Sequence, residues 1–430
     1  MFLQPKKIKR PVPQAPAFAA TSPAPLQKPQ NPNELPKVVE PAFVPPEKVA
    51  ALEEKIEKKL GKDNPKPPKK ASWWRRTPRK KKILILVPLV LLLAGGGVTA
   101  FILTRPDPPK PAVPETVVEK VEEPPKPTTV ASKLTGAQVD PELNKRGITA
   151  VMIENSKEAR PQSGLLEAGI VYEAIAEGGI TRFLALYQEA QPSYIGPVRS
   201  ARPYYIDWLL PYNASYAHAG GSAEALSLIN SLKVRDMDHS ANGSSYQRVD
   251  SRFAPHNLYT SMASLDAIRA KKGWDAPEFT GFARKEDIPG RTLTATTINL
   301  NISGPTFAVK YTHDAASNSY KRTLAGIPHI DEKSGKQLQP KVVVALVIPY
   351  SIHPDGVHSK YQTVGTGQAY VFQDGVYQEA SWSKSTQSAA LELYDTGGRV
   401  LQLNAGQTWI TAVGLANMVT YTGPPAGATP

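Results

Sequence analysis

A run of 21 uncharged, mostly apolar residues at positions 83–103 constrains this chain more than any other feature of its sequence. At about 1.5 Å per residue, a helix of that length spans the roughly 30 Å hydrocarbon core of a bilayer. Positions 69–82 hold eight basic and no acidic residues, whereas positions 104–111 hold two basic residues. Because basic residues stay on the cytoplasmic side, we expect one transmembrane helix, a cytoplasmic N-terminus and an extracytoplasmic C-terminal part.

The formal net charge of +13 belongs to the N-terminal tail. Residues 1–82 carry 20 of the 51 Lys and Arg and 7 of the 38 Asp and Glu, so the remaining chain carries 31 of each. We therefore predict no nucleic-acid partner for the folded part. The same tail contains 16 prolines, which predicts a disordered segment that offers a binding region to a cytoplasmic partner.

Composition divides the rest of the chain into three segments. Residues 104–133 are rich in proline and predict an extended extracytoplasmic linker. In 134–285, strand and helix patterns alternate, which predicts an α/β domain with helices packed on a mixed sheet. In 290–417, short strand patterns separated by turn signals predict a β-rich domain. The predicted hairpin turns include Gly178–Gly179 in the first of these domains and Asp374–Gly375 in the second.

Two arginines precede a predicted helix in the stretch "IGPVRSARPYYIDW" at 195–208. Arg199 and Arg202 lie at the approach to a helix that begins at Pro203, where backbone N–H groups and the helix dipole already favour an anion. The planar guanidinium group binds a carboxylate or a phosphate with two hydrogen bonds. We therefore expect an anion-recognition site, with Tyr204 packing against the ligand. The alternative is that these arginines pair internally with Glu154, Glu173 or Glu177.

Further candidate residues follow nearby strands. The turn His218–Ala219–Gly220–Gly221 leads from a strand into a helix and could present backbone N–H groups to an anion, although glycine pairs also occur there for steric reasons. In "APHNLY", His256 and Asn257 occupy a loop suited to ligand hydrogen bonding or to fixing the loop itself. We predict no metal and no cofactor, since "IHPDGVH" at 352–358 matches no zinc spacing.

The hairpin sequence "EAIAEGGITR" at 173–182 holds Glu173, Glu177 and Arg182. Two carboxylates across a cleft are what acid/base cleavage of a glycoside requires. With His256, these glutamates are the candidate catalytic residues of an envelope glycan hydrolase or lyase. A structural ion pair at a solvated hairpin is the alternative.

Several long motifs together resemble one family. They are "AVMIENSKEARPQSGLLEAGIVYEAIAEGGITRFLALYQ", "IGPVRSARPYYIDW", "YAHAGGSAEAL", "APHNLYTS" and "VFQDGVYQEASWSKSTQSAALELYDTGGRVLQLNAGQTWI". They resemble the YerB-like family of bacterial envelope lipoproteins, whose N- and C-terminal domains have no known function. The resemblance covers roughly residues 134–413 and implies an extracytoplasmic location, but no reaction or substrate. Family members carry a lipidated cysteine, whereas this chain has no cysteine and a predicted transmembrane helix instead.

These observations lead to one main functional hypothesis. We expect a membrane-anchored extracytoplasmic protein that binds an anionic cell-envelope polymer or small ligand through Arg182, Arg199 and Arg202. The glycan hydrolase or lyase described above is the second hypothesis, and whether the chain is an enzyme stays open.

Overall fold

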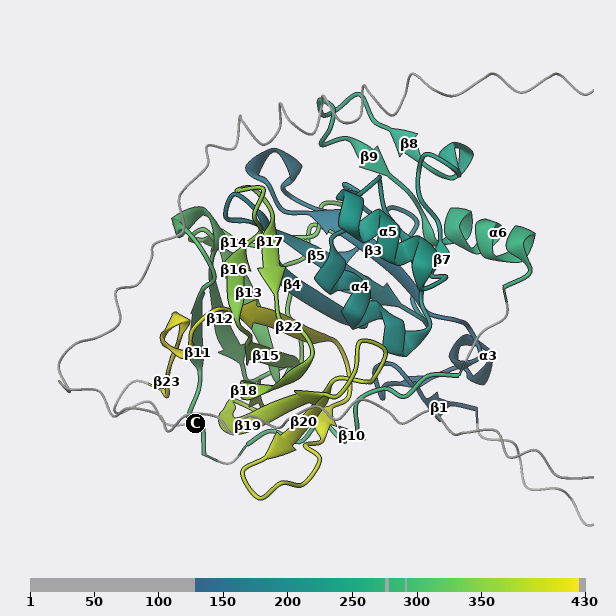
Figure 1. The fold of residues 1–430 in the computed structure, drawn as a ribbon. Helices are drawn as coiled ribbons and strands as arrows, with labels where there is room; N and C mark the ends of the chain where they lie inside the picture. Colours follow the sequence, from purple (N-terminus) through teal and green to yellow (C-terminus); the bar gives the residue numbers. More distant parts are fainter. Residues whose placement is uncertain (1–127, 275–277, 291, 425–430) are drawn as a thin grey trace, which may run out of the picture. The chain divides into compact units, whose positions relative to one another are not determined.

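The computed structural model describes residues 128–274, 278–290 and 292–424 (Figure 1). The predicted tail at 1–82, the predicted span at 83–103 and most of the predicted linker at 104–133 lie outside these ranges. Within the described ranges, no helix is long and apolar enough to cross a bilayer.

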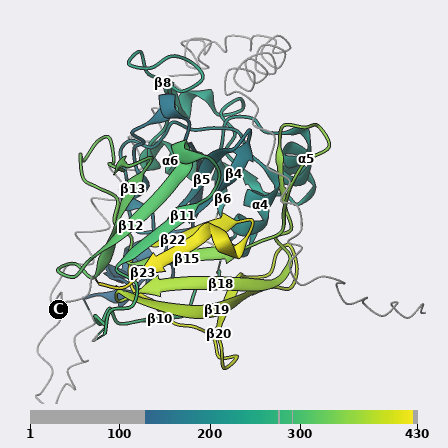
Figure 2. The same cartoon turned by 90° about the vertical axis from the view of Figure 1, so that its left-hand side faces the viewer.

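The largest element is a ten-stranded mixed sheet to which both parts of the chain contribute strands. In spatial order its strands are β20 (Glu392–Asp395), β19 (Val376–Lys384), β18 (Gly365–Gln373), β15 (Val342–Val347), β22 (Thr408–Val413), β4 (Ile170–Glu177), β5 (Ile180–Tyr187), β3 (Thr149–Glu154), β6 (Ser215–Ala217) and β7 (Arg235–Asp236). Figure 2 shows β18, β19 and β20 side by side at one end of it. The two groups of five strands meet where β22 pairs in parallel with β4.

A second sheet of five strands comes from the C-terminal part alone. Its order is β14 (Ile327–Pro328), β13 (Ser319–Leu324), β12 (Ala308–Asp314), β11 (Thr297–Asn301) and β23 (Val419–Thr422). Four two-stranded pairs complete the β-structure: β1 (Val130–Ala131) with β2 (Gln138–Val139), β8 (Gln247–Arg248) with β9 (Leu258–Tyr259), β10 (Arg284–Lys285) with β21 (Leu403–Asn404), and β16 (Tyr350–Ile352) with β17 (Ser359–Tyr361).

The described α-helices are few and short. They are α3 (Pro141–Asn144), α4 (Pro203–Leu209), α5 (Ala223–Ser231) and α6 (Met262–Lys272). Capping follows from the sequence: the side chain of Ser261 accepts from the N–H of Ser264 at the start of α6, and Gly273 ends that helix with a φ of +64°. A single 3₁₀ turn, Leu165–Glu167, lies between β3 and β4.

The predicted fold class is therefore wrong: the described chain is mainly β-structure, and its N-terminal part is not an α/β unit. Strands β4 and β5 are buried along their whole length, as expected when both faces of a sheet are covered. On one face Tyr172 stacks on Trp208 of α4, with ring centroids 5.3 Å apart. On the other face the cover is the five-stranded sheet rather than a second layer of helices. The residues of a strand indicate that it is buried, but not which element covers it.

One buried ion pair joins the two sheets. Glu173 of β4 and Arg322 of β13 are both fully buried, and Arg322 Nη2 donates to Glu173 Oε2 at 2.7 Å. The same carboxylate oxygen accepts from Trp409 Nε1 at 2.9 Å, and Thr181 Oγ1 donates to Oε1 at 3.1 Å. The Arg322 guanidinium also lies 4.5 Å from the centre of the Trp409 ring. Both oxygens of the buried carboxylate thus accept hydrogen bonds.

Replacing Glu173 by Gln should lower the free energy of unfolding by about 3 kcal/mol or more, because Arg322 would keep its charge without the carboxylate. Chemical denaturation of the full chain measures this. Glu379→Gln, which removes an exposed carboxylate from β19 of the same sheet, is the matched control and should change stability by about 0.5 kcal/mol or less. Equal effects of the two substitutions would contradict the assigned role.

Candidate functional site

The candidate site begins where β3 and β5 lie side by side in the ten-stranded sheet. Glu154, the last residue of β3, is the register partner of Arg182 in β5, so both side chains leave the same face. The segment before α4 continues the pairing, because the N–H of Arg199 donates to the carbonyl of Met152 at 2.9 Å. Arg202 is the N-cap of α4. Backbone pairing therefore brings Arg199 and Arg202 of the loop close to Arg182 of β5.

Five buried charged side chains meet there and form what we call the arginine cluster: Glu154, Glu177, Arg182, Arg199 and Arg202. Glu177 Oε2 accepts from Arg202 Nη2 at 2.7 Å and Nε at 3.1 Å, and its Oε1 accepts from Arg182 Nη2. Arg199 Nε lies 3.3 Å from Glu154 Oε2. No side chain of the five is more than 5% exposed. Three guanidinium groups and two carboxylates give the cluster a formal charge of +1.

A β-bulge separates the two candidate catalytic glutamates. The pairing of β4 with β5 changes register between Ile175 and Glu177, so that Glu177 lies opposite Ile180. A bulge redirects the side chain that follows it. Glu177 consequently belongs to the arginine cluster, while Glu173 faces the five-stranded sheet. Two carboxylates in separate ionic networks, one of them fully buried, do not form the facing pair that glycoside cleavage uses.

His256 lies at the edge of the arginine cluster. Its Nδ1 is 2.8 Å from Glu154 Oε1 and 3.3 Å from Ser156 Oγ, and its side chain is 15% exposed. Where a histidine activates a serine nucleophile, the serine and the orienting carboxylate contact opposite nitrogens of the histidine ring. Here both groups contact the same nitrogen, so this arrangement positions His256 on Glu154 rather than activating Ser156.

The predicted glycine turn lies directly beside the arginine segment. The N–H of Ala201 donates to the carbonyl of Gly220 at 2.9 Å, and a Cβ on Gly221 would lie 3.2 Å from the Ala201 side chain. The N–H of Gly220 donates to Asp238 Oδ1 at 2.7 Å. His218 is fixed as well, with Nδ1 2.8 Å from the Gly220 carbonyl. The turn therefore supports the cluster from the neighbouring strand, and the Gly220 N–H is already used.

Two other predicted ligand residues have internal partners. Tyr204 is 2% exposed, donates from its hydroxyl to the carbonyl of Ile175 at 2.7 Å, and has a pKa raised well above 10 by burial and by Tyr361. Asn257 donates to the carbonyl of Val249 at 3.0 Å and accepts from Arg248 at 2.9 Å. Tyr204 thus packs in the core, and Asn257 fixes its loop.

Arg322 is an important charged residue that sequence reasoning missed. In β13, the buried positions Tyr320, Arg322 and Leu324 alternate with the exposed Lys321. This alternation places the arginine on the inward face, which is a readable signal, although its partner lies 149 positions away.

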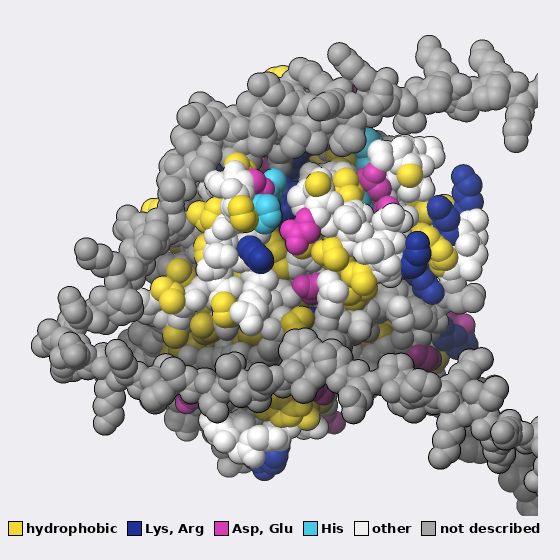
Figure 3. Space-filling model, viewed as in Figure 1, with side chains coloured by type: hydrophobic (Ala, Val, Ile, Leu, Met, Phe, Trp, Pro, Cys, Tyr) yellow, Lys and Arg dark blue, Asp and Glu magenta, His cyan; other side chains and the backbone are white. Residues whose placement is uncertain are grey.

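A histidine-containing turn lies next to Glu177. The N–H of Gly178 donates to the carbonyl of Val357 at 3.3 Å, and His358 Nδ1 lies 2.6 Å from Asp355 Oδ2. Charged and histidine side chains gather between β17 and α5 on the face that Figure 3 shows. Among the residues described, no group of three or more His, Asp or Glu side chains could hold a metal ion.

Comparison with known proteins gives consistent matches over this part of the chain. The N-terminal domain of a protein of unknown function, DUF3048, matches residues 134–275, and its C-terminal domain matches residues 298–410. The chain is 30% identical to "Putative lipoprotein YerB" of Bacillus subtilis (strain 168) over 284 residues, which are 65% of this chain and 85% of that protein. The crystal structure of Bacillus subtilis YerB matches with a TM-score of 0.63 at 28% identity, covering 68% of this chain and 99% of that one.

The arginine cluster predicts a sensitivity to acid. Burial by itself raises the pKa of Glu154, but Arg199 and the hydrogen bond to His256 outweigh it and hold the pKa below 4.5. A carboxyl with a lower pKa in the folded state stabilises the fold above about pH 4.5, and this contribution is lost as the pH falls through the lowered value. Thermal unfolding at a series of pH values should therefore show a smaller acid-induced loss in Glu154→Gln than in the unchanged protein.

Glu167 offers a control of opposite sign. Burial and Asp331 raise the pKa of Glu167, so the folded state gains from its protonation as the pH falls. Glu167→Gln removes this gain, so the acid-induced loss of stability should be slightly larger than in the unchanged protein. The explanation fails if Glu154→Gln retains the full acid-induced loss.

Proposed function

This chain belongs to the YerB-like DUF3048 family of proteins of unknown function, and from its arginine cluster we propose that it binds an anionic component of the cell envelope. The observation that carries the proposal is that Arg182, from a strand, and Arg199 and Arg202, from a separate loop, lie in one buried cluster with Glu154 and Glu177. Arginine is the side chain best suited to hold a carboxylate or a phosphate, because its planar fork matches both groups.

The two glutamates of the cluster prepare it for such a ligand. Glu177 orients Arg182 and Arg202, and Glu154 orients Arg199, so the donors are held in place by ion pairs. Side chains that are already ordered lose little conformational entropy when a ligand binds. The formal charge of +1 on these five groups favours an anion electrostatically.

Helix α5 adds to the positive potential beside the cluster. Its N-cap Ser222 follows Gly221, which forms a bridge with Ala201 between the two arginines of the loop. The N-terminus of a helix carries a partial positive charge. A ligand with a carboxylate or phosphate group at the cluster would therefore interact favourably with both the guanidinium groups and α5.

The name of the Bacillus subtilis relative supports the proposed location. That relative is described as a putative lipoprotein. On this basis we propose that the described part of this chain lies on the extracytoplasmic side of the membrane, where wall polymers supply carboxylates and phosphates. A ligand-holding role fits the cluster better than acid/base cleavage does, because Glu173 and Glu177 lie in separate networks.

Binding can be tested by co-sedimentation of the full chain with purified cell-wall sacculi, with and without their covalently attached anionic polymers. Replacing Arg199 and Arg202 together by Lys keeps the charge and removes the two-hydrogen-bond fork, so binding should weaken about tenfold or more. Arg399→Lys is the matched control, because Arg399 is 85% exposed at a distant turn, and it should bind as the unchanged protein does.

Circular dichroism of each variant separates lost binding from lost folding. Binding should also weaken as salt is added, since salt screens the attraction between charges. Unchanged binding by the folded double variant, or equal binding to sacculi with and without anionic polymer, would refute the proposal.

A further inference from the structure

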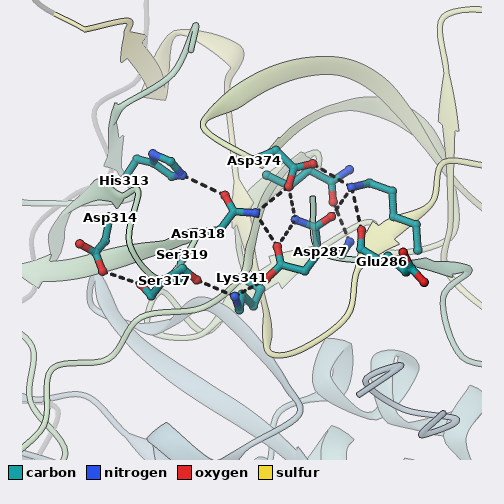
Figure 4. Close-up of polar contacts among 12 residues, drawn as sticks. Glu286, Asp287, His313, Asp314, Ser317, Asn318, Ser319, Lys341 and Asp374 are labelled. Carbon is teal, nitrogen blue, oxygen red and sulfur yellow. Dashed lines mark hydrogen bonds and ion pairs between the residues drawn. The ribbon is translucent and has the colours of Figure 1, made fainter. Parts of the chain in front are cut away.

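A second polar cluster, remote in sequence from the arginine cluster, joins segments between residues 285 and 404 (Figure 4). Its main members are Lys285, Asp287, Asn318, Lys341, Asp374 and Asn404. They come from β10 and the loop after it, the β12–β13 turn, the approach to β15, the β18–β19 turn and β21. Figure 4 shows Asp374, Asn318, Asp287 and Lys341 converging from these segments.

An amine and an amide meet within this cluster. Strands β10 and β21 pair in parallel with Lys285 as the register partner of Asn404. Lys285 Nζ contacts the side-chain oxygen of Asn404, one bond from the amide carbon Cγ. The nucleophilic atom of one side chain is therefore held at the electrophilic group of the other.

One carboxylate bridges both reacting groups. Asp374 Oδ2 lies 2.8 Å from Lys285 Nζ, and Asp374 Oδ1 accepts from Asn404 Nδ2 at 2.5 Å. Asp374 begins the Asp–Gly turn between β18 and β19, with a φ of +59°. The turn aims the carboxylate at the space between the amine and the amide. A carboxylate in this position can take a proton from one nitrogen and deliver it to the other.

The reacting groups are ordered and largely shielded from water. Asn404 is fully buried, its backbone N–H donates to Gln373 Oε1 at 2.8 Å, and its Nδ2 also donates to Asp287 Oδ1 at 3.1 Å. The side chains of Asp374 and Lys285 are 13% and 30% exposed. Such fixed neighbours have effective concentrations on the order of 10⁵ M or more, which makes reactions fast that are negligible between free molecules.

We propose that Lys285 and Asn404 form an isopeptide bond by a reaction of the chain with itself. Asp374 removes a proton from Lys285 Nζ, and the free amine attacks Asn404 Cγ to give a tetrahedral intermediate. Asp374 then passes protons to Nδ2, the Cγ–Nδ2 bond breaks, and ammonia leaves as ammonium. A lysine ammonium and an asparagine amide become one secondary amide and one ammonium ion, and Asp374 is again a carboxylate. No oxidant, metal or cofactor enters this balance.

The bond would serve as a covalent crosslink in a chain that has no cysteine for disulfides. It would join β10 to β21 across a sequence separation of 119 residues. In the sequence, β10 comes just before the first strand of the five-stranded sheet, and β21 comes just before β22. A crosslink that closes a loop restricts the unfolded chain. Lys341 offers the internal comparison, because its Nζ contacts Asp287 and the carbonyl of Ser317 rather than an amide side chain.

Mass spectrometry of the purified full chain tests the proposal. The unchanged protein should weigh less than its sequence mass by one ammonia molecule. Its tryptic digest should contain one branched peptide in which cleavage after Lys285 is blocked and Asn404 is the linked residue. Lys285→Arg and Asp374→Asn should both have the full sequence mass, whereas Lys341→Arg should still lack one ammonia.

The peptide map of the unchanged protein decides the question even if a variant fails to fold. A full sequence mass, with separate unmodified peptides containing Lys285 and Asn404, overturns the proposal. Loss of one water molecule overturns it too, because that loss marks a bond from lysine to an aspartate. Ammonia loss that persists in Lys285→Arg would assign the modification to other residues.

Discussion

The buried ion pair between Glu173 and Arg322 is the interaction on which the two-sheet arrangement depends. It lies between the sheets, where a single charge would be very unfavourable, so each residue requires the other in place. Trp409 and Thr181 complete the carboxylate's hydrogen bonds, and these donors come from β22 and β5. The pair thereby fixes the relative position of strands that are far apart in the sequence. Hydrophobic packing alone would permit more than one alignment of two sheet faces, whereas one matched pair of buried charges permits few.

The bulge in β4 distributes charge to both faces of the same strand. Glu173 completes the contact between the sheets on one face, and four residues later Glu177 organises the arginine cluster on the other. The β3–β5 pairing and the loop before α4 then bring the three arginines to Glu154 and Glu177. The fold and the candidate site are thus built from one hairpin, with its tip at Gly178–Gly179, where both glycines have positive φ values. Because this one hairpin contributes to both the sheet contact and the candidate site, several charged residues of one short stretch are buried.

Local features of this structure follow from the sequence, and long-range ones do not. The glycine pair at 178–179 predicts the β4–β5 hairpin, and Pro203 predicts the start of α4. The arginines of 199–202 stand out by residue type and spacing, and Glu154 and Glu177 were foreseeable as their alternative partners. A shift of one residue in register leaves no trace in composition, so the separation of Glu173 from Glu177 could not be predicted. Strand periodicity likewise predicts burial without showing that a second sheet, rather than helices, covers β4 and β5. The domain boundaries at 134–285 and 290–417 stay predictions.

The parallel pairing of β22 with β4 has a consequence for how the chain folds as it is made. Until residue 413 has been synthesised, β4 would be an open edge strand with unpaired N–H and C=O groups. The counter-charge of Glu173 also arrives late, 149 residues further along the chain. The strands before residue 240 therefore present an open edge until β22 has been synthesised, and such an exposed edge attracts other chains. The N-terminal strands therefore cannot complete the ten-stranded sheet on their own, because its other five strands are supplied by residues 342–413.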